Sequence, residues 1–235
     1  MKNALLLPFL VALISFPAVA GCIEGNGELT TKRIDLDEFT ELSLRTRAKI
    51  FLYQGPEQKV DIIAESNLIE YLNTDVTGDE WAVSFEKCII PHKKIEIHIT
   101  MKTITELEIN ASNDLVAEGL LKGDELEIEV NGAGDIDLNL EYNKLSTEIN
   151  GAGDIKYSGK VTIHEIDIRG AGDIKAYDLA SEEVEICIKG AGDANLSVSK
   201  KLDVSIYGAG DVKYKGDPPV LDVSKVGAGS VRKVE

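Results

Sequence analysis

The residues best suited to chemistry are aspartates that recur at a regular spacing. The tetrapeptide Gly-Ala-Gly-Asp begins at Gly132, Gly151, Gly170, Gly190 and Gly208, and a variant, Gly-Ala-Gly-Ser, begins at Gly227. The intervals between copies are 19, 19, 20, 18 and 19 residues, and the aspartates are Asp135, Asp154, Asp173, Asp193 and Asp211. A side chain that returns at one period predicts a column of like residues in a repeat architecture.

A column of carboxylates needs an explanation for its charge. Neighbouring carboxylates stacked about 4.8 Å apart would repel by roughly 0.9 kcal/mol per pair in water. One solution is Ca²⁺, which takes several carboxylate and carbonyl oxygens and would be the one cofactor of the chain. The alternative is that each Asp accepts backbone N–H bonds at its own corner. We expect the second role and keep these aspartates as calcium candidates.

The alanines between the two glycines form a second candidate site. These small residues are Ala133, Ala152, Ala171, Ala191 and Ala209. A strip of small side chains lets a partner approach the backbone, so it is a candidate docking face for a glycan, a protein or a second copy of the chain. The same residues are also what a tight corner requires, and the sequence leaves both interpretations open.

Catalytic signals are weak. The chain has only three His, at 92, 98 and 164, and each is expected to be an ordinary surface or strand residue. No Ser-His-Asp signature, phosphate-binding loop or metalloprotease motif occurs in it. Asp and Glu outnumber Lys and Arg by 41 to 25, and the net charge of −16 argues against nucleic acid as a partner. We therefore predict no catalytic residues and no enzymatic activity.

The elements that carry these residues alternate with a period of two. Around Gly132 the positions in phase with the glycines are apolar, such as Ile128, Val130 and Ile136, whereas those between them are polar or small. This alternation predicts strands with one buried face. The two glycines lie on that face, where we expect them to allow a sharp bend.

Two all-β folds satisfy this pattern, a parallel β-solenoid with coils of about 19 residues and a meander of hairpins. Asn-Gly favours hairpin turns, but later copies replace the Asn by Arg169, Lys189 and Tyr207, which such turns tolerate poorly. We therefore expect the solenoid, with less regular coils before residue 105 and one short helix at residues 67–73. Lys225 and Lys233 replace aliphatic residues in the last copy and predict a solvent-facing end.

The N-terminal residues predict export. A charged start and a short apolar stretch, at residues 1–21, are typical of a signal peptide. The stretch ends Val19-Ala20-Gly21-Cys22, which resembles a bacterial lipobox and predicts lipidation of Cys22; the alternative is ordinary cleavage after Ala20. We expect a lipid-anchored linker over residues 22–28 and one solenoid domain over residues 29–235, with the repeats in residues 105–235. For Cys88 and Cys187 we expect two unpaired thiols, with a bridge between them as the alternative.

The chain resembles the head GIN domain family of auto-transporter adhesins over roughly residues 29–235. The resemblance lies in the iterated Gly-x-Gly-Asp, in Phe39 followed by a strand that ends at Gln54-Gly55, and in Leu-Asp-Val-Ser at Leu202 and Leu221. It implies export from a Gram-negative cell and a right-handed β-solenoid. It supplies no catalytic residues.

We therefore expect an exported outer-membrane lipoprotein, facing the periplasm or the exterior, that is a non-catalytic adhesion or binding module. Its partners would be the membrane, through its lipid anchor, and a glycan or protein ligand, with self-association open. The second hypothesis is a carbohydrate-binding or polysaccharide-cleaving β-helix protein.

Overall fold

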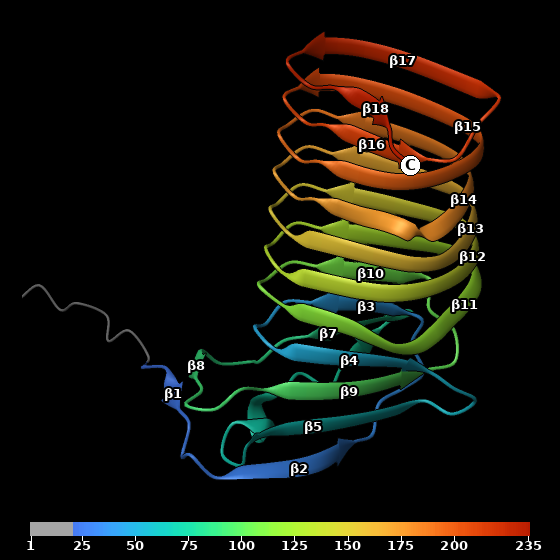
Figure 1. The fold of residues 1–235 in the computed structure, drawn as a ribbon. Helices are drawn as coiled ribbons and strands as arrows, with labels where there is room; N and C mark the ends of the chain where they lie inside the picture. Colours follow the sequence, from blue (N-terminus) through green and yellow to red (C-terminus); the bar gives the residue numbers. More distant parts are fainter. Residues whose placement is uncertain (1–20) are drawn as a thin grey trace, which may run out of the picture.

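The computed structural model describes residues 21–235 as a column of stacked β-coils on a broader base (Figure 1). Within residues 21–235 the only helical element is the 3-10 turn η1 (Ile69–Tyr71), which lies within the predicted residues 67–73. In the described part of the chain no helix is long and apolar enough to cross a membrane. The expected signal peptide spans residues 1–21, and residues 1–20 of it lie outside the described residues.

Five long strands build most of the column, and each is separated from the next by a glycine-rich segment. They are β11 (Asp114–Val130), β12 (Asp135–Ile149), β13 (Asp154–Ile168), β14 (Ile174–Ile188) and β15 (Ala194–Gly208). Each pairs in parallel with the next, with Ile136 beside Ile155 and Ile155 beside Ile174. The prediction of a β-solenoid in which equivalent residues stack is confirmed, and the hairpin alternative is excluded.

Aliphatic side chains fill the interior because the period-two alternation continues through every coil. Two inner columns are almost completely buried: Ile136, Ile155, Ile174, Ala194 and Val212, and Val130, Ile149, Ile168, Ile188 and Ile206. Full burial of a Val, Leu or Ile side chain contributes about 1.5–3 kcal/mol, so these columns are the main source of stability. On the outside, Asn150 donates an amide hydrogen bond to Asn131, and Asn131 donates one to Asn110, which forms a short ladder.

The chain bends at the first glycine of most copies, as expected, and the glycines also allow a close approach between coils that the sequence did not predict. The N–H of Ala171 donates to the carbonyl O of Gly151 at 3.1 Å, and Ala191 does the same to Gly170. A Cβ on Gly170 or Gly190 would overlap the carbonyl oxygen of the equivalent glycine in the preceding coil. Of the glycines in the motif copies, only Gly227 has a positive φ, so the corners themselves do not need left-handed backbone.

Two less regular coils continue the column downward. The strands β3 (Glu41–Leu44), β4 (Lys49–Gln54), β7 (Glu80–Val83), β9 (Glu96–Met101) and β10 (Glu106–Ile109) pair in parallel with one another or with β11. The register places Lys49 beside both Glu96 and Asp114. Parallel stacking therefore starts well before the first recognisable tetrapeptide, as the sequence predicts.

The lowest strands do not stack as coils, which corrects part of the sequence prediction. Strand β5 (Lys59–Glu65) runs antiparallel to β9, β2 (Leu29–Ile34) runs antiparallel to β5, and β6 (Val76–Thr77) runs antiparallel to β7. Phe39 and Trp81 pack here with ring centroids 5.5 Å apart and are buried. The antiparallel strands and these aromatic rings close the lower end of the core.

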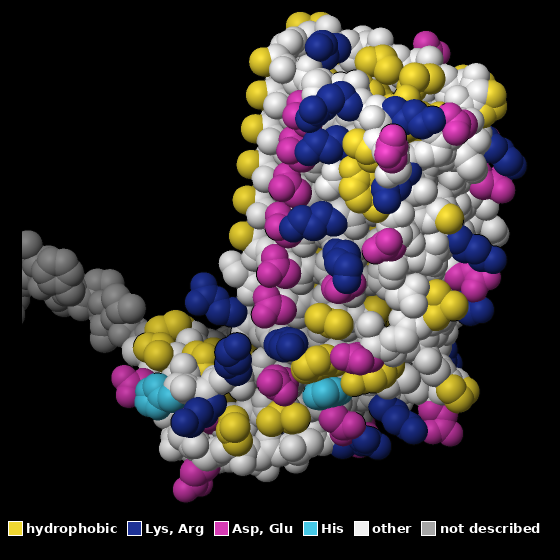
Figure 2. All heavy atoms as spheres, in the orientation of Figure 1, with side chains coloured by type: hydrophobic (Ala, Val, Ile, Leu, Met, Phe, Trp, Pro, Cys, Tyr) yellow, Lys and Arg dark blue, Asp and Glu magenta, His cyan; other side chains and the backbone are white. Residues whose placement is uncertain are grey.

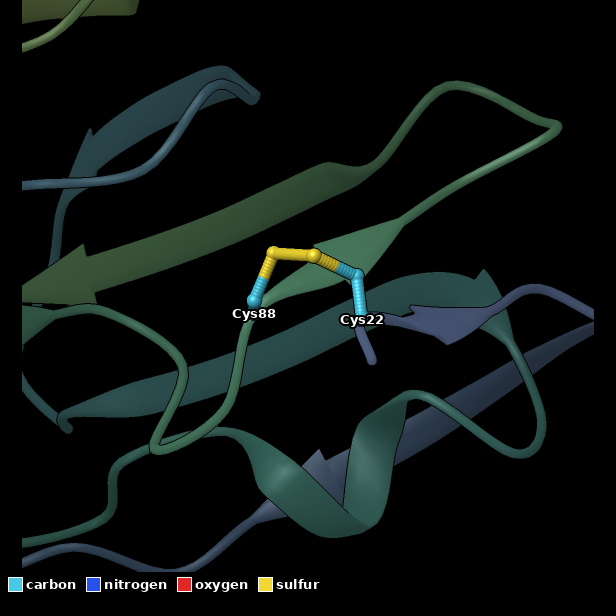
Figure 3. Close-up of a disulfide and its surroundings, with 2 residues drawn as sticks. All are labelled: Cys22 and Cys88. Carbon is cyan, nitrogen blue, oxygen red and sulfur yellow. A yellow bond between two sulfur atoms is a disulfide. The ribbon is translucent and has the colours of Figure 1, made fainter. Parts of the chain in front are cut away.

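Residues 22–28 are not a free linker, because part of this segment joins the base. Strand β1 (Ile23–Glu24) pairs in parallel with β8 (Ile89–Ile90), and Cys22 is disulfide-bonded to Cys88 (Figure 3). Neither expectation for Cys88, an unpaired thiol or a bridge to Cys187, matches this arrangement. Cys187 is a free thiol, as expected.

The upper end of the column is open. Strands β16 (Val212–Lys215), β17 (Val220–Gly227) and β18 (Val231–Lys233) form the last coils, and every residue of β17 is exposed. Lys225 pairs with Ile206 and Lys233 with Tyr214 in the ladders below. The predicted solvent-facing end with lysines in core positions is confirmed.

Replacing a seam glycine tests the close approach of the coils. Gly190→Ala places a Cβ against the carbonyl oxygen of Gly170, so we expect a loss of about 1–3 kcal/mol in the free energy of unfolding, measured in urea. An exposed glycine without this constraint would instead gain stability from the same change. Ala191→Ser is the matched control and should be nearly neutral. Equal stability of Gly190→Ala and the wild type would contradict the proposed role of the seam.

Candidate functional site

Three of the repeat aspartates, Asp173, Asp193 and Asp211, accept hydrogen bonds from the backbone of the next coil. The Oδ1 atom of Asp173 accepts the N–H of Asp193 at 2.8 Å, and Oδ1 of Asp193 accepts the N–H of Asp211 at the same distance. At the top, Oδ1 of Asp211 accepts both the N–H and the hydroxyl of Ser230. The expected hydrogen bond to backbone N–H is present, but the donor comes from the following coil and not from the same corner.

Further donors and cations offset the charge of the column. The hydroxyl and N–H of Ser230, followed by the nearby Arg232 and Lys213, lower the pKa of the Asp211 carboxyl. Asp154 accepts a hydrogen bond from Lys175 at 2.7 Å, and this bond raises the pKa of the Lys175 ammonium group. Within residues 21–235 no group of three or more His, Cys, Asp or Glu side chains is arranged to hold a metal ion. Calcium binding by the repeat aspartates stays a prediction.

The alanine strip is exposed along the whole column. Ala133, Ala152, Ala171, Ala191, Ala209 and Ala228 are all exposed, and the backbone N–H of each from Ala152 onward bonds to the coil below. Figure 2 shows a row of small hydrophobic side chains along one edge, beside a column rich in acidic side chains. The strip is therefore flat and accessible, and its use as a docking face stays a prediction.

A groove at the base, which we call the basal groove, was not expected from the sequence. It has a volume of about 990 Å³ and lies where the loop after β3, the segment around β8 and the first stacked corner meet. Its basic lining side chains are Arg45, Arg47, Lys49, Lys87, His92, Lys93 and Lys94, and its one acidic lining residue is Asp114. Figure 2 shows basic side chains gathered where the β1 and β8 projection meets the column. A groove of this charge is unexpected in a chain with a net charge of −16.

A buried carboxylate fixes one wall of the basal groove. Glu65 has a fully buried side chain whose oxygens accept the N–H groups of Gly27, His92 and Lys93 at 2.6, 2.7 and 3.2 Å. Burial by itself would raise the pKa of the Glu65 carboxyl, but these three backbone donors outweigh it and leave the pKa below its usual range. Gly25 lies against the same carboxylate, where a Cβ would overlap it. The loop that carries His92 and Lys93 is therefore held in place.

The groove escaped the sequence analysis because its residues come from three separate segments. Two local signals were nevertheless available: alternate basic residues at Arg45, Arg47 and Lys49, and the pair Lys93-Lys94 directly after Pro91-His92. Their meeting depends on the parallel pairing of β4 with both β9 and β11. The expectation that His92 is a surface residue holds, but the surface belongs to a groove.

His164 lies inside the column and not on its surface. Its ring is fully buried, its Nε2 lies 3.3 Å from the hydroxyl of Thr147, and that hydroxyl lies 3.1 Å from the hydroxyl of Tyr157. The Nδ1 atom has no hydrogen-bond partner among the described residues. Burial lowers the pKa of His164 to about 3. The sequence contained the signal, because residue 164 is in phase with the buried Ile166 and Ile168.

The pKa of His164 predicts a stability that depends on pH. Because this pKa is lowered from about 6.5, protonation favours the unfolded chain, so stability is complete above pH 6.5 and is lost as the pH falls toward 3. His164→Leu removes this dependence. We expect wild type to lose roughly 1.4 kcal/mol per pH unit below 6.5 relative to the variant, measured by urea unfolding. A constant difference from pH 7 to pH 4 would contradict the burial of a neutral His164.

The repeat aspartates can be tested at Asp193. Asp193→Asn keeps the Oδ1 acceptor for the N–H of Asp211, whereas Asp193→Ala removes it. We expect a loss of about 1–2 kcal/mol for Ala and much less for Asn, measured by urea unfolding with calcium and with a chelator. If calcium raises the melting temperature and Asp193→Asn abolishes that rise, the carboxylate binds metal and the backbone role is insufficient.

Crystal structures of related proteins share this fold. A putative adhesin from Bacteroides fragilis is 28% identical, with a TM-score of 0.86 over 90% of this chain and 100% of its own. A putative adhesin from Parabacteroides merdae is 26% identical, with a TM-score of 0.70 over 92% and 100%. A putative lipid binding protein from Parabacteroides distasonis is 23% identical, with a TM-score of 0.74 over 92% and 100%, a likeness of fold alone.

No curated protein matches the chain. The family model described as "Putative auto-transporter adhesin, head GIN domain" matches residues 38–218, which include both irregular coils and most of the regular column. This match confirms the resemblance drawn from the repeated tetrapeptide. The chain belongs to the head GIN domain family.

Proposed function

We propose that the chain is an exported, lipid-anchored, non-catalytic module of the cell envelope that binds or adheres through its exposed column. The observation that supports this most directly is that short segments connect the long strands of the regular coils. Between Asp135 and Gly208 the long strands are separated only by the glycine-rich corners. Such coils have no long loops from which to build the walls of a catalytic cleft, whereas their flat faces offer a repeated, rigid contact surface.

The anchor in this proposal is an acylated Cys22. Residue 22 lies at the base, next to β1, so that a lipid there would hold the base near a membrane and leave the upper coils away from it (Figure 1). A thioether to lipid and a disulfide to Cys88 exclude each other, because each uses the same sulfur atom. The proposal therefore requires that the lipidated protein carry Cys88 as a free thiol.

The proposed location is the outer membrane, with the column in the periplasm or on the cell exterior. The ligand in this proposal is a glycan or a protein surface, and the alanine strip, which is exposed from Ala133 to Ala228, is its proposed contact. Membership of a family described as adhesins supports a surface role. Protease treatment of intact cells distinguishes the two faces, because only an exterior column is cut.

Acylation predicts different outcomes for the two cysteines of the disulfide. In a Gram-negative host, the full chain should be found in membranes with acyl mass on residue 22 and a free thiol at Cys88. After a high-salt wash, which removes contacts made by charge alone, Cys22→Ser should be in the soluble fraction, whereas the matched variant Cys88→Ser should stay with the membrane. Mass spectrometry and fractionation measure both. A Cys22–Cys88 disulfide without acyl mass, and equal fractionation of the variants, would overturn the anchor.

Binding is tested on a glycan array and on host proteins with Ala171→Arg as the contact variant. Arginine at this exposed corner should abolish binding through the strip and leave the melting temperature nearly unchanged. Lys156→Glu, on an adjacent outer column, is a control that changes charge without filling the strip. Cleavage of an acidic polysaccharide by the purified chain would replace this proposal by the second hypothesis, a polysaccharide-cleaving β-helix protein.

A further inference from the structure

We infer that the basal groove is a binding site for the phosphate headgroups of an anionic membrane surface. The inference deepens the proposed function and rests on it in one respect, the anchor at residue 22. The groove would be a second contact with the same membrane, made by protein side chains and not by the lipid. It lies at the end of the molecule that the anchor would hold near the membrane.

The distribution of unpaired cations carries the inference. Of the 24 Lys and Arg residues within residues 21–235, 14 lie within 4 Å of a carboxylate. Ten of those described therefore have no ion pair, and five of these ten line the basal groove: Arg47, Lys49, Lys87, Lys93 and Lys94. Every cation from Lys102 to Lys200 has an ion pair, and four lysines near the upper end of the column have none among the described residues, so the groove holds the largest group of cations without partners. Charges that the fold leaves without partners are suited to an external anion.

Apolar side chains share the groove with these cations. Ile89, Ile90 and Pro91 line it, and Ile90 is 47% exposed. Exposed aliphatic groups next to lysines are typical of surfaces that rest at the boundary between headgroups and acyl chains. A free inorganic anion would gain nothing from contact with these apolar side chains, whereas a lipid surface would bury them. This favours a lipid surface over dissolved phosphate.

Contacts within the fold hold parts of the groove in place. Glu65 holds the backbone of His92 and Lys93, and Arg45 donates to Glu80 at 2.8 Å and to Ser43 at 2.9 Å. On the other wall the ammonium group of Lys49 lies 4.8 Å from the centre of the Phe51 ring. A fixed backbone at Lys93 and a ring beneath Lys49 reduce the conformational freedom lost on binding, so ordering offsets less of the attraction to phosphate.

The position of residue 22, beside the groove, indicates the membrane as the partner of the groove. The N–H of Ile23 donates to the carbonyl of Cys88, and Lys87 and Ile89, on either side of Cys88, both line the groove. A lipid on Cys22 would therefore hold the groove close to the membrane, because Cys22 lies beside the segment that lines the groove. The opposite end of the column, at β17, lies farthest from it (Figure 1). The basic base would face anionic headgroups and the acidic column would project outward.

Vesicle flotation tests this contact without the anchor. The exported chain carrying Cys22→Ser, which has no acyl group, should float with vesicles of phosphatidylcholine and phosphatidylglycerol but not with phosphatidylcholine alone. Lys93→Glu with Lys94→Glu should weaken binding at least tenfold, because each cation near an anionic surface contributes about a fivefold factor. Binding should also decrease as salt rises.

The control changes the same net charge at the upper end of the column. Lys201→Glu with Lys213→Glu replaces two cations that have no ion pair among the described residues, and it should leave flotation unchanged. Equal melting temperatures confirm that each variant is folded. Absence of flotation, or an equal loss in both double variants, would overturn the inference. Binding of inorganic phosphate in the groove without flotation would also overturn it, in favour of a dissolved ligand. A chain that floats but is never acylated in cells would contradict the anchor alone.

Discussion

The close approach of successive coils at the glycine seam is the constraint on which the rest of the column depends. The N–H of each corner alanine from Ala152 onward bonds to a glycine carbonyl one coil below, and the glycines leave no Cβ between them. This fixes the corner of every coil directly over the corner beneath it. Isoleucines then fall on isoleucines inside, and the Asp173 carboxylate reaches the backbone of Asp193 outside. A column of like charges is tolerated because the carboxylates of Asp173, Asp193 and Asp211 each receive a backbone donor and that of Asp154 receives Lys175.

The two ends of the column are closed in different ways, because a stack of parallel strands has no natural end. Antiparallel strands and the buried Trp81 cover the lower end. The upper end keeps its edge exposed and places Lys225 where other coils have isoleucine. A lysine at an open edge disfavours the addition of another strand. The chain thus has one end suited to a contact with a surface and another that resists continued stacking.

Electrostatics separates the base from the column. Ion pairs along the coils neutralise most lysines, as Lys175 with Asp154 and Lys156 with Asp137 illustrate. The basal groove is lined by cations without such partners. The Glu65 carboxylate does not pair with them, because it accepts hydrogen bonds from backbone N–H groups. A strongly acidic protein therefore presents a basic surface at the end where its chain enters the fold. This polarity gives the molecule a preferred orientation toward an anionic surface, with the column directed away from it.

The sequence by itself determined the strands, their parallel stacking and the buried face, because a period of two and a period of about 19 are local patterns that a single chain records. The same alternation runs through His164, which lies in a strand as expected, but only the structure showed that its ring is buried. Only the tertiary structure decided which backbone the repeat aspartates bind, because the donor lies one coil away. It alone assembled the basal groove, because Arg47, Lys94 and Asp114 meet only when β4 lies between β9 and β11. Contacts that join distant segments depend on register, which the repeat of about 19 residues records for the regular coils and no repeat records for the base.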